Sequence, residues 1–395
     1  MLKDISVSAV FMGALAALVG YGAAFAVVLQ GLRGVGATEA QAATGLMAVS
    51  IAMGLAGMVL SLWRREPLTV AWSTPGAALL ASSAAPAGGF AEAVGAFLIC
   101  GALLTAAGLW RPLARAVAAI PGPIASAMLA GVLLSLCLAP AKAVAVDPTM
   151  GLPIVIAWAV GGRIHKLLAV PAALVAFAGV LFLVADVSLS EAAEAVADPT
   201  PDFTLVSPVF TLSSAIGVAA PLFLVTMAGQ NIPGVAVLKS FGYDSKPGAP
   251  FAVTGAFSFL FAPLGGHAVN LAAITAALCA GEDAHPDKAR RYWAAATMGA
   301  VSVALGLLTG AAVSFVSLAP TILIEAVAGL ALISAFAAAS LNAFSDPKDR
   351  EAAAVTLLVT ASGLNFFGIS GAFWGLLAGL ALYALQRIAR PRASS

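Results

Sequence analysis

Residues 67–80 read PLTVAWSTPGAALL, and residues 263–276 read PLGGHAVNLAAITA. Each stretch begins with Pro-Leu and carries small or polar residues inside an apolar run. Both runs are shorter than the roughly 20 residues that a helix needs to cross a bilayer. A shift of 196 residues aligns the two Pro-Leu pairs and sets Thr74 against Asn270.

A second pair of stretches indicates the same repeat. Residues 127–134 read AMLAGVLL and residues 325–332 read EAVAGLAL, at a shift of 198 residues. Because the two pairs share nearly the same offset, we predict that the chain consists of two related halves.

The composition is typical of a protein whose solvent is lipid. Of the 395 residues, 61% are apolar and 9% are charged, whereas a soluble domain has roughly 25% charged residues. The net charge of +1 does not indicate a nucleic-acid partner. The three cysteines, Cys100, Cys137 and Cys279, have no pair spacing that would predict disulfides or a metal site.

The apolar runs predict an all-α polytopic membrane protein with fourteen membrane segments. Four of them look too short to span alone, namely 68–82, 150–162, 249–262 and 266–280. The others are 7–29, 41–62, 91–109, 121–139, 167–185, 213–238, 293–318, 322–344, 352–367 and 370–387. We interpret the first run as a retained helix and not as a cleaved signal.

The distribution of basic residues predicts the orientation. If the N-terminus is cytoplasmic, the inner connections hold every lysine and arginine except Arg33 and Lys142, as the positive-inside rule requires. Both termini are therefore expected in the cytoplasm. The longest outer loop, 186–207, divides the chain near its middle. Seven segments per half is an odd number, so the two repeats must be inverted, which is characteristic of secondary transporters.

The two interrupted segments, spans 3 and 10 in this count, predict a site. Irregular backbone at membrane depth must face protein or a wet cavity, so we expect an extended stretch followed by a half-helix in each. Two opposed half-helix N-termini near the midplane would offer free N–H groups to a small anion, particularly a carboxylate. The alternative interpretation is two Gly/Pro kinks in ordinary helices.

Four polar residues of these segments are predicted to surround the carboxylate, namely Ser73, Thr74, His267 and Asn270. We place His267 at the start of the second half-helix. It is also a candidate for relaying a proton, and the alternative role is a hydrogen-bonded core residue.

Gln230 and Asn231 are adjacent polar residues in the stretch TMAGQNIPG at 226–234. Unbonded amides in mid-span are costly, so these two either donate to the carboxylate or tie helices together. Tyr21 and Trp72 are candidates for an aromatic wall, with ordinary packing as the alternative.

Glu325 is the acid that falls within a predicted span and away from its charged ends. An intramembrane carboxylate is a functional candidate because its burial is expensive. We predict that it carries the coupling proton. The alternative is a solvated position at the outer mouth, since the span begins at Ile322.

Enzyme motifs are absent from the sequence. It has no H-E-x-x-H, G-x-S-x-G or P-loop stretch, and we expect no enzymatic activity, no cofactor and no metal. Without an ATP-binding motif, uphill transport would require an ion or proton gradient.

Four stretches together resemble a known family. TVAWSTPGAALL, TMAGQNIPGVAVL, APLGGHAVNLAAITAAL and EAVAGLAL are similar to the signature stretches of the bacterial benzoate/proton symporters (BenE), along essentially the whole chain. The resemblance implies import of benzoate with a proton across the bacterial inner membrane.

The family is distantly similar to the nucleobase and sulfate transporter fold. That likeness implies a core domain from spans 1–4 and 8–11 and a gate domain from spans 5–7 and 12–14. The corresponding ranges here are 1–110 and 208–318 for the core, and 111–190 and 319–395 for the gate. The nucleobase branch uses glutamates where this chain has Gln230 and Asn270, so a nucleobase substrate is disfavoured.

The sequence thus predicts a proton-coupled importer of benzoate or a similar aromatic carboxylate. The expected partners are this substrate, a proton and the lipid bilayer, with a second copy of the chain as a candidate homodimer partner and no nucleic acid. The alternatives are an importer of another small organic anion, a passive anion channel and, more remotely, an intramembrane enzyme.

Overall fold

The protein is described by a computed structural model that covers residues 5–198, 200–201, 203–367 and 369–388. The expected domain ranges 1–110 and 319–395 thus begin and end with residues outside this description. The elements of the first half are α1 (Val7–Gly34), α2 (Glu39–Arg64), β1 (Val70–Trp72), α3 (Thr74–Ser82), α4 (Phe90–Leu109), α5 (Arg111–Ala118), α6 (Gly122–Cys137), α7 (Ala139–Val146), α8 (Pro148–Ile164), η2 (Lys166–Leu168), α9 (Ala169–Leu183) and α10 (Leu189–Ala195).

The second half is also helical, with two π-helical turns, η3 and η4, inside one long helical stretch. Its elements are α11 (Leu212–Ser214), η3 (Ala215–Ala219), α12 (Ala220–Thr226), η4 (Met227–Asn231), α13 (Ile232–Ser240), α14 (Gly248–Phe261), η5 (Ala262–Leu264), β2 (Val269–Leu271), α15 (Ile274–Ala280), η6 (Lys288–Arg290), α16 (Tyr292–Leu307), α17 (Thr309–Ser317), α18 (Thr321–Ala343), α19 (Arg350–Ala361), β3 (Asn365–Phe366), β4 (Ile369–Ser370) and α20 (Gly371–Ile388).

The architecture is that of an all-α polytopic membrane protein. Within the described residues, eight helical segments are long and apolar enough to cross a bilayer, or nine if α16 and α17 form one span. These two helices meet at an angle of 54°. The short helices α5 and α7 were not expected from the sequence; each has proline in its first turn, where the missing N–H costs nothing.

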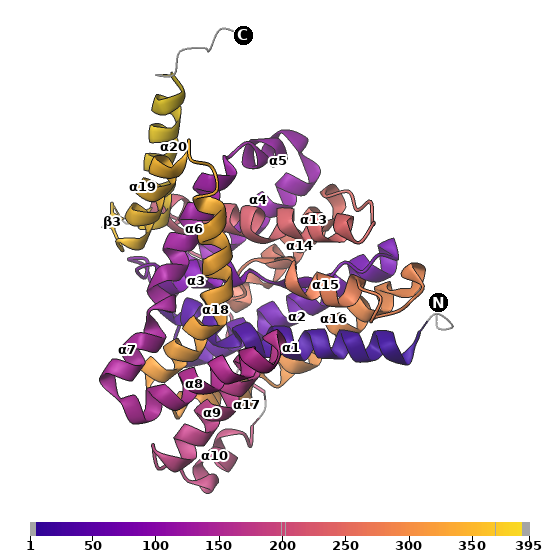
Figure 1. Ribbon diagram of the computed structural model, residues 1–395, viewed down its shortest axis with the longest axis vertical. Helices are drawn as coiled ribbons and strands as arrows, with labels where there is room; N and C mark the ends of the chain where they lie inside the picture. The colour runs from indigo at the N-terminus through magenta and orange to yellow at the C-terminus, as the bar shows by residue number, and fades with distance from the viewer. Residues whose placement is uncertain (1–4, 199, 202, 368, 389–395) are drawn as a thin grey trace.

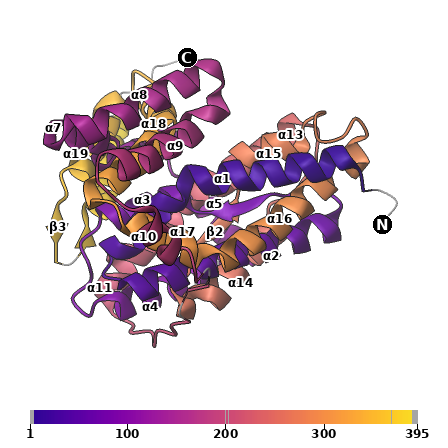
Figure 2. The same cartoon turned by 90° about the horizontal axis from the view of Figure 1, so that it is seen from below.

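Long helices from the two halves of the chain pack against each other. α16 lies beside α2 and α1 (Figure 2), and α18 lies beside α6 (Figure 1). Gly54 of α2 and Gly299 of α16 face each other where α2 and α16 pack closely. A Cβ added at Gly54 would lie 2.5 Å from the carbonyl oxygen of Gly299. Small residues allow the two helices to approach this closely. Within a membrane no hydrophobic effect drives helices together, so close packing supplies the dispersion energy that stabilises the pair.

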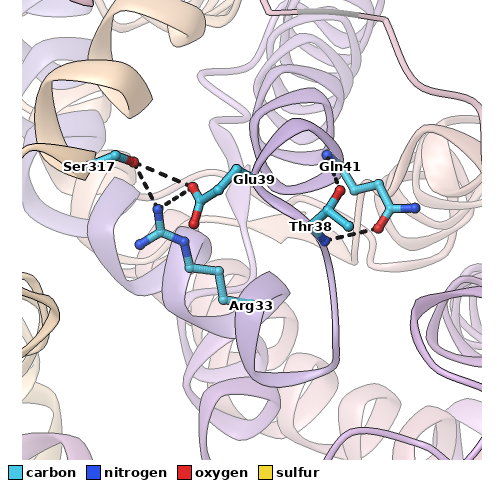
Figure 3. Close-up of polar contacts among 5 residues, drawn as sticks. All are labelled: Arg33, Thr38, Glu39, Gln41 and Ser317. Atoms are coloured by element: carbon cyan, nitrogen blue, oxygen red, sulfur yellow. Dashed lines mark hydrogen bonds and ion pairs between the residues drawn. The ribbon is translucent and has the colours of Figure 1, made fainter.

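The turn between α1 and α2 is held by polar side chains. Thr38 and Gln41 form a capping box, in which the Thr38 N–H donates to Oε1 of Gln41 at 2.9 Å and the Gln41 N–H donates to Oγ1 of Thr38 at 3.3 Å (Figure 3). Arg33 pairs with Glu39 at 2.5 Å and donates to Oγ of Ser317 at 3.0 Å (Figure 3). The cluster therefore ties this turn to the end of α17, although an exposed ion pair contributes only about 0–1 kcal/mol.

The two interrupted segments meet in an antiparallel ribbon. Strand β1 pairs with β2, with Val70 opposite Leu271 and Trp72 opposite Val269. Helix α3 follows β1 after Ser73, and α15 follows β2. Each segment thus has an extended part before a short helix and is not a kinked continuous helix. Pairing lets the extended backbone groups satisfy one another where water is scarce.

The spacing of these elements differs from the alignment that the sequence suggested. The two strands begin 199 residues apart and the two helices 200 residues apart, and not 196. Thr74 is the first residue of α3, whereas Asn270 lies in the middle of β2 opposite Ala71. The shared Pro-Leu pairs misled the alignment because the turn at Gly265, where φ is +80°, makes the second segment longer before its strand.

Candidate functional site

A cavity of about 150 Å³ lies where the two interrupted segments meet α1. Residues at the start of α3 line it, as do Ala272, Ala273 and Thr275 around the start of α15. Helices α2, α6, α16 and α18 and the π-helical turn η4 contribute the remaining walls. Both halves of the chain therefore build this one cavity.

One wall of the cavity is aromatic. The rings of Tyr21 and Trp72 are 5.1 Å apart between centroids and tilted by 58°, and Tyr21 also stacks on Phe25 at 6.0 Å. Both lining aromatic residues are buried. The backbone N–H of Trp72 faces Sδ of Met53 at 3.3 Å, and Met53 is itself part of the apolar lining. The sequence predicted both aromatic residues, and the structure brings them together.

Hydroxyl and amide side chains reach the cavity wall from several elements, including Ser302 of α16 and Ser334 of α18. Thr74 opens α3, Gln230 lies in η4, and Thr275 lies in the first turn of α15. None of the lining residues is an aspartate, glutamate, histidine, lysine or arginine, within the part of the chain that the structure describes. The cavity thus combines an apolar interior with a few uncharged hydrogen-bonding groups, a composition common in small-molecule sites.

The π-helical turn separates two adjacent amides. Gln230 lines the cavity, whereas Asn231 is 0% exposed and does not line it. Oδ1 of Asn231 accepts from the backbone N–H of Leu271 at 2.9 Å. Asn231 therefore ties the helical stretch to strand β2, and Gln230 remains available to a ligand. Single π-helical turns within α-helices are frequent at functional sites.

Ser73 and Asn270 lie behind the cavity wall. Ser73 caps α3 by accepting from the Gly76 N–H at 3.1 Å, and its hydroxyl bonds to that of Thr226 at 2.8 Å. The amide of Asn270, oriented to satisfy both of its groups, accepts from the Ser73 N–H and donates to the Leu271 carbonyl. Neither residue lines the cavity. They hold the ribbon in shape and thereby position Thr74.

His267 lies outside the cavity. Its placement at the start of the second half-helix is wrong, because strand β2 intervenes and α15 begins only at Ile274. The residue is 1% exposed, and Nδ1 of its imidazole lies 3.0 Å from the carbonyl oxygen of Ala268. Its ring meets Phe97 edge to face at 6.4 Å. His267 is therefore buried beside the ribbon, and its Nε2 has no hydrogen-bond partner within the described residues.

Glu325 lines a different cavity, of about 240 Å³, together with Lys142, Ser135 and Ser82. It is half-buried there, and the two cavities have no lining residue in common. Gly329, one turn further along α18, packs so closely on α6 that an added Cβ would lie 2.1 Å from the carbonyl oxygen of Leu136. Helix α18 continues from this contact to the first cavity, which it lines with Ala331, Leu332, Ser334 and Ala335.

Comparison with known proteins identifies the family. A family model described as "Benzoate membrane transport protein", BenE, matches residues 3–385. The chain belongs to the BenE family. The inner membrane protein YdcO of Escherichia coli is 38% identical over 381 residues, covering 96% of each chain. The benzoate membrane transport protein of Acinetobacter baylyi is 31% identical over 393 residues, covering 99% of this chain and 98% of the relative.

Membership in BenE confirms the resemblance found in the sequence. It makes the protein a membrane transporter and not an enzyme. In this BenE protein, sequence reasoning missed Thr275 and the apolar lining residues Met298 and Leu332. Thr275 stood within the second interrupted segment, but nothing in the sequence distinguished it from its neighbours.

Proposed function

We propose that this BenE protein is a secondary active transporter that imports benzoate, or a similar aromatic carboxylate, together with a proton. The observation that carries the proposal is the cavity between the two interrupted segments, with its aromatic wall and its few uncharged polar groups. The description of the Acinetobacter baylyi relative as a benzoate membrane transport protein supports the choice of substrate.

Benzoate fits the character of this cavity. Its ring is flat and apolar, so Tyr21 and Trp72 are the proposed ring contacts. Its carboxylate needs hydrogen-bond donors, and Thr74 and Gln230 are the proposed ones. Helix α3 has nine residues and begins at Thr74, so the partial positive charge of its N-terminus lies beside the proposed donor Thr74. Ser73, Asn231 and Asn270 support these groups from behind.

The proposed architecture has fourteen membrane segments in two inverted repeats of seven, with half-helices at spans 3 and 10. The antiparallel pairing of one interrupted segment from each half supports inversion. A core domain of 1–110 and 208–318 would hold the cavity's interrupted segments, and a gate domain of 111–190 and 319–395 would contribute α6 and α18. Both termini would be cytoplasmic, and two copies would form a homodimer.

Proton coupling requires a group that takes up and releases a proton as the substrate moves. Glu325 and His267 are the proposed carriers, although neither lines the proposed substrate cavity. A coupled carrier outside the cavity would act through movement of α18 or of the ribbon. The alternative is transport of the substrate as the neutral acid, which an uncharged lining favours over the anion.

The experiment is uptake of labelled benzoate into proteoliposomes with an imposed pH gradient, acidic outside. A symporter accumulates benzoate above its external concentration, and a protonophore abolishes the accumulation. A passive channel only equilibrates the label. Protein-free liposomes are an essential control, because neutral benzoic acid crosses lipid unaided and is trapped on the alkaline side. Uptake equal to that control at every gradient would contradict the proposal.

If benzoate is not taken up, the same assay tests the other candidate. Other labelled organic acids are offered in place of benzoate, and unlabelled aliphatic and aromatic acids compete with any that enters. Uptake that such competitors inhibit would identify an importer of another organic anion. The aromatic wall makes us expect that aromatic acids compete better.

A further inference from the structure

Thr275 carries a polar group in the cavity wall that has no partner in the protein. The residue is 5% exposed and lines the cavity. Its hydroxyl oxygen is buried without a hydrogen-bond partner. Among the buried side-chain atoms in this condition in the described chain, Oγ1 of Thr275 is the one whose residue lines this cavity.

The local fold explains why this hydroxyl is unsatisfied. A serine or threonine within a helix usually donates to the carbonyl four residues earlier, and several helices here follow that rule. Ser50 donates to Leu46 at 2.6 Å, and Ser302 donates to Met298 at 2.8 Å. The residue four positions before Thr275 is Leu271, which lies in strand β2 and outside the helix. Helix α15 therefore begins too late to supply the carbonyl.

Thr275 lies in the cavity wall beside α1. Its methyl group faces α1, because a Cβ added at Gly20 would lie 3.3 Å from Cγ2 of Thr275. The backbone N–H of Ala272, also in the cavity wall, already donates to the carbonyl of Thr69 at 3.0 Å. A buried hydroxyl without a partner costs free energy. An acceptor bound in the cavity would recover it, provided that rotation about the Cα–Cβ bond turns the hydroxyl, which is covered in this structure, toward the ligand.

We propose that Thr275 donates its hydroxyl hydrogen to the carboxylate of the bound substrate and so helps select carboxylates among aromatic molecules. This inference rests on the proposed function. The carboxylate would then be held from three elements, by Thr74 on α3, Gln230 on η4 and Thr275 on α15. Only a ligand with a hydrogen-bond acceptor at this place can accept from the Thr275 hydroxyl. An aromatic molecule without an acceptor group therefore gains no hydrogen bond there.

The test uses two substitutions at this position in the full chain, purified into lipid nanodiscs. Thr275→Val removes the hydroxyl at nearly constant shape, and Thr275→Ser keeps it. Thr356→Val is the matched control, since Thr356 is also a buried threonine but lies outside the cavity and donates to the carbonyl of Ala352 at 2.8 Å. Benzoate affinity is measured by calorimetry, and thermal unfolding is measured with and without benzoate.

We expect Thr275→Val to weaken benzoate binding by about tenfold or more, as loss of a hydrogen bond to a charged group does. Thr275→Ser and Thr356→Val should stay within about threefold of the parent in benzoate affinity. Without ligand, Thr275→Val should unfold at or above the parent temperature, because a methyl group replaces an unsatisfied hydroxyl. The stabilisation that benzoate confers should be smaller in this variant.

Three results would overturn the proposal. Parent-like affinity of Thr275→Val for benzoate would remove the role of the hydroxyl while leaving the proposed function intact. Lower unfolding temperatures of both Thr275 variants without ligand, with unchanged affinity, would assign Thr275 a structural role. A parent protein that binds no benzoate would overturn the proposed function and this inference with it.

Discussion

The hydroxyl of Tyr21 lies 3.0 Å from Oγ1 of Thr309, which is 288 residues away in the sequence. Tyr21 belongs to the aromatic wall of the cavity, and Thr309 begins α17 at the 54° bend from α16. Because the tyrosine hydroxyl is bonded there, its ring has a defined orientation beside Trp72. The wall of the cavity and the bend of this helix pair are thus directly connected.

Replacing Tyr21 with phenylalanine keeps the ring and removes this bond. We expect Tyr21→Phe to lose about 0.5–1.5 kcal/mol of stability, typical of one buried hydrogen bond, and to keep most of its benzoate affinity. Thr309→Val removes the same bond from the other side. In a thermal-unfolding double-mutant cycle, the double variant should therefore lose less stability than the two single variants lose together. If the losses are fully additive, the bond contributes nothing to stability.

Trp72→Ala should weaken aromatic carboxylates more than acetate. A lost aromatic contact affects only a ligand that has a ring, whereas both ligands share the carboxylate contacts. The measurement is inhibition of benzoate uptake by substituted benzoates and by acetate. Trp110→Ala is the control, since Trp110 is exposed and lies outside the cavity. Equal loss for both ligand classes would indicate a folding defect instead.

Gln230 and Asn231 should give opposite results although they are neighbours. Asn231→Ala leaves the Leu271 N–H without its acceptor in a buried place, which should cost about 1–3 kcal/mol of stability. Gln230→Ala should leave the unfolding temperature near that of the parent and lower benzoate affinity. Unfolding and binding measured on both variants check this, and a stability loss in Gln230→Ala would place it among the structural residues.

The α2–α16 contact predicts an effect of single methyl groups. Gly54→Ala would place Cβ against the Gly299 carbonyl and should destabilise the protein by about 1–3 kcal/mol, as overpacking does. Gly179→Ala, also within a helix, meets nothing within 4 Å and should be neutral or slightly stabilising, because alanine is the better helix former. Unfolding temperatures of the two variants in the same detergent test the contrast.

Glu325→Gln tests the proposed proton carrier. If Glu325 couples the proton, the neutral glutamine should mimic its protonated form, so that benzoate exchange across the membrane persists while accumulation driven by pH fails. His267→Gln is assayed in parallel, and Glu39→Gln, an acid at the start of α2, serves as the control. Accumulation at the parent level in Glu325→Gln would direct attention to His267 or to transport of the neutral acid.

Several properties were predictable from the sequence because they depend on local composition. With 61% apolar and 9% charged residues, the composition predicts a chain surrounded by lipid. Because backbone polar groups in lipid must be hydrogen-bonded within the protein, long apolar runs are expected to cross it as α-helices. The Gly and Pro interruptions at 67–80 and 263–276 predicted non-helical backbone there. The family was also recognisable, since its signature stretches are continuous in sequence.

Tertiary structure alone decided how these parts meet. The strand register sets Ala71 opposite Asn270, and hydrogen bonds between such distant segments leave no local pattern that predicts them. One π-helical turn separates the roles of Gln230 and Asn231. The late start of α15, fixed by pairing of β2 with β1, leaves the Thr275 hydroxyl without a carbonyl and places the residue in the cavity wall.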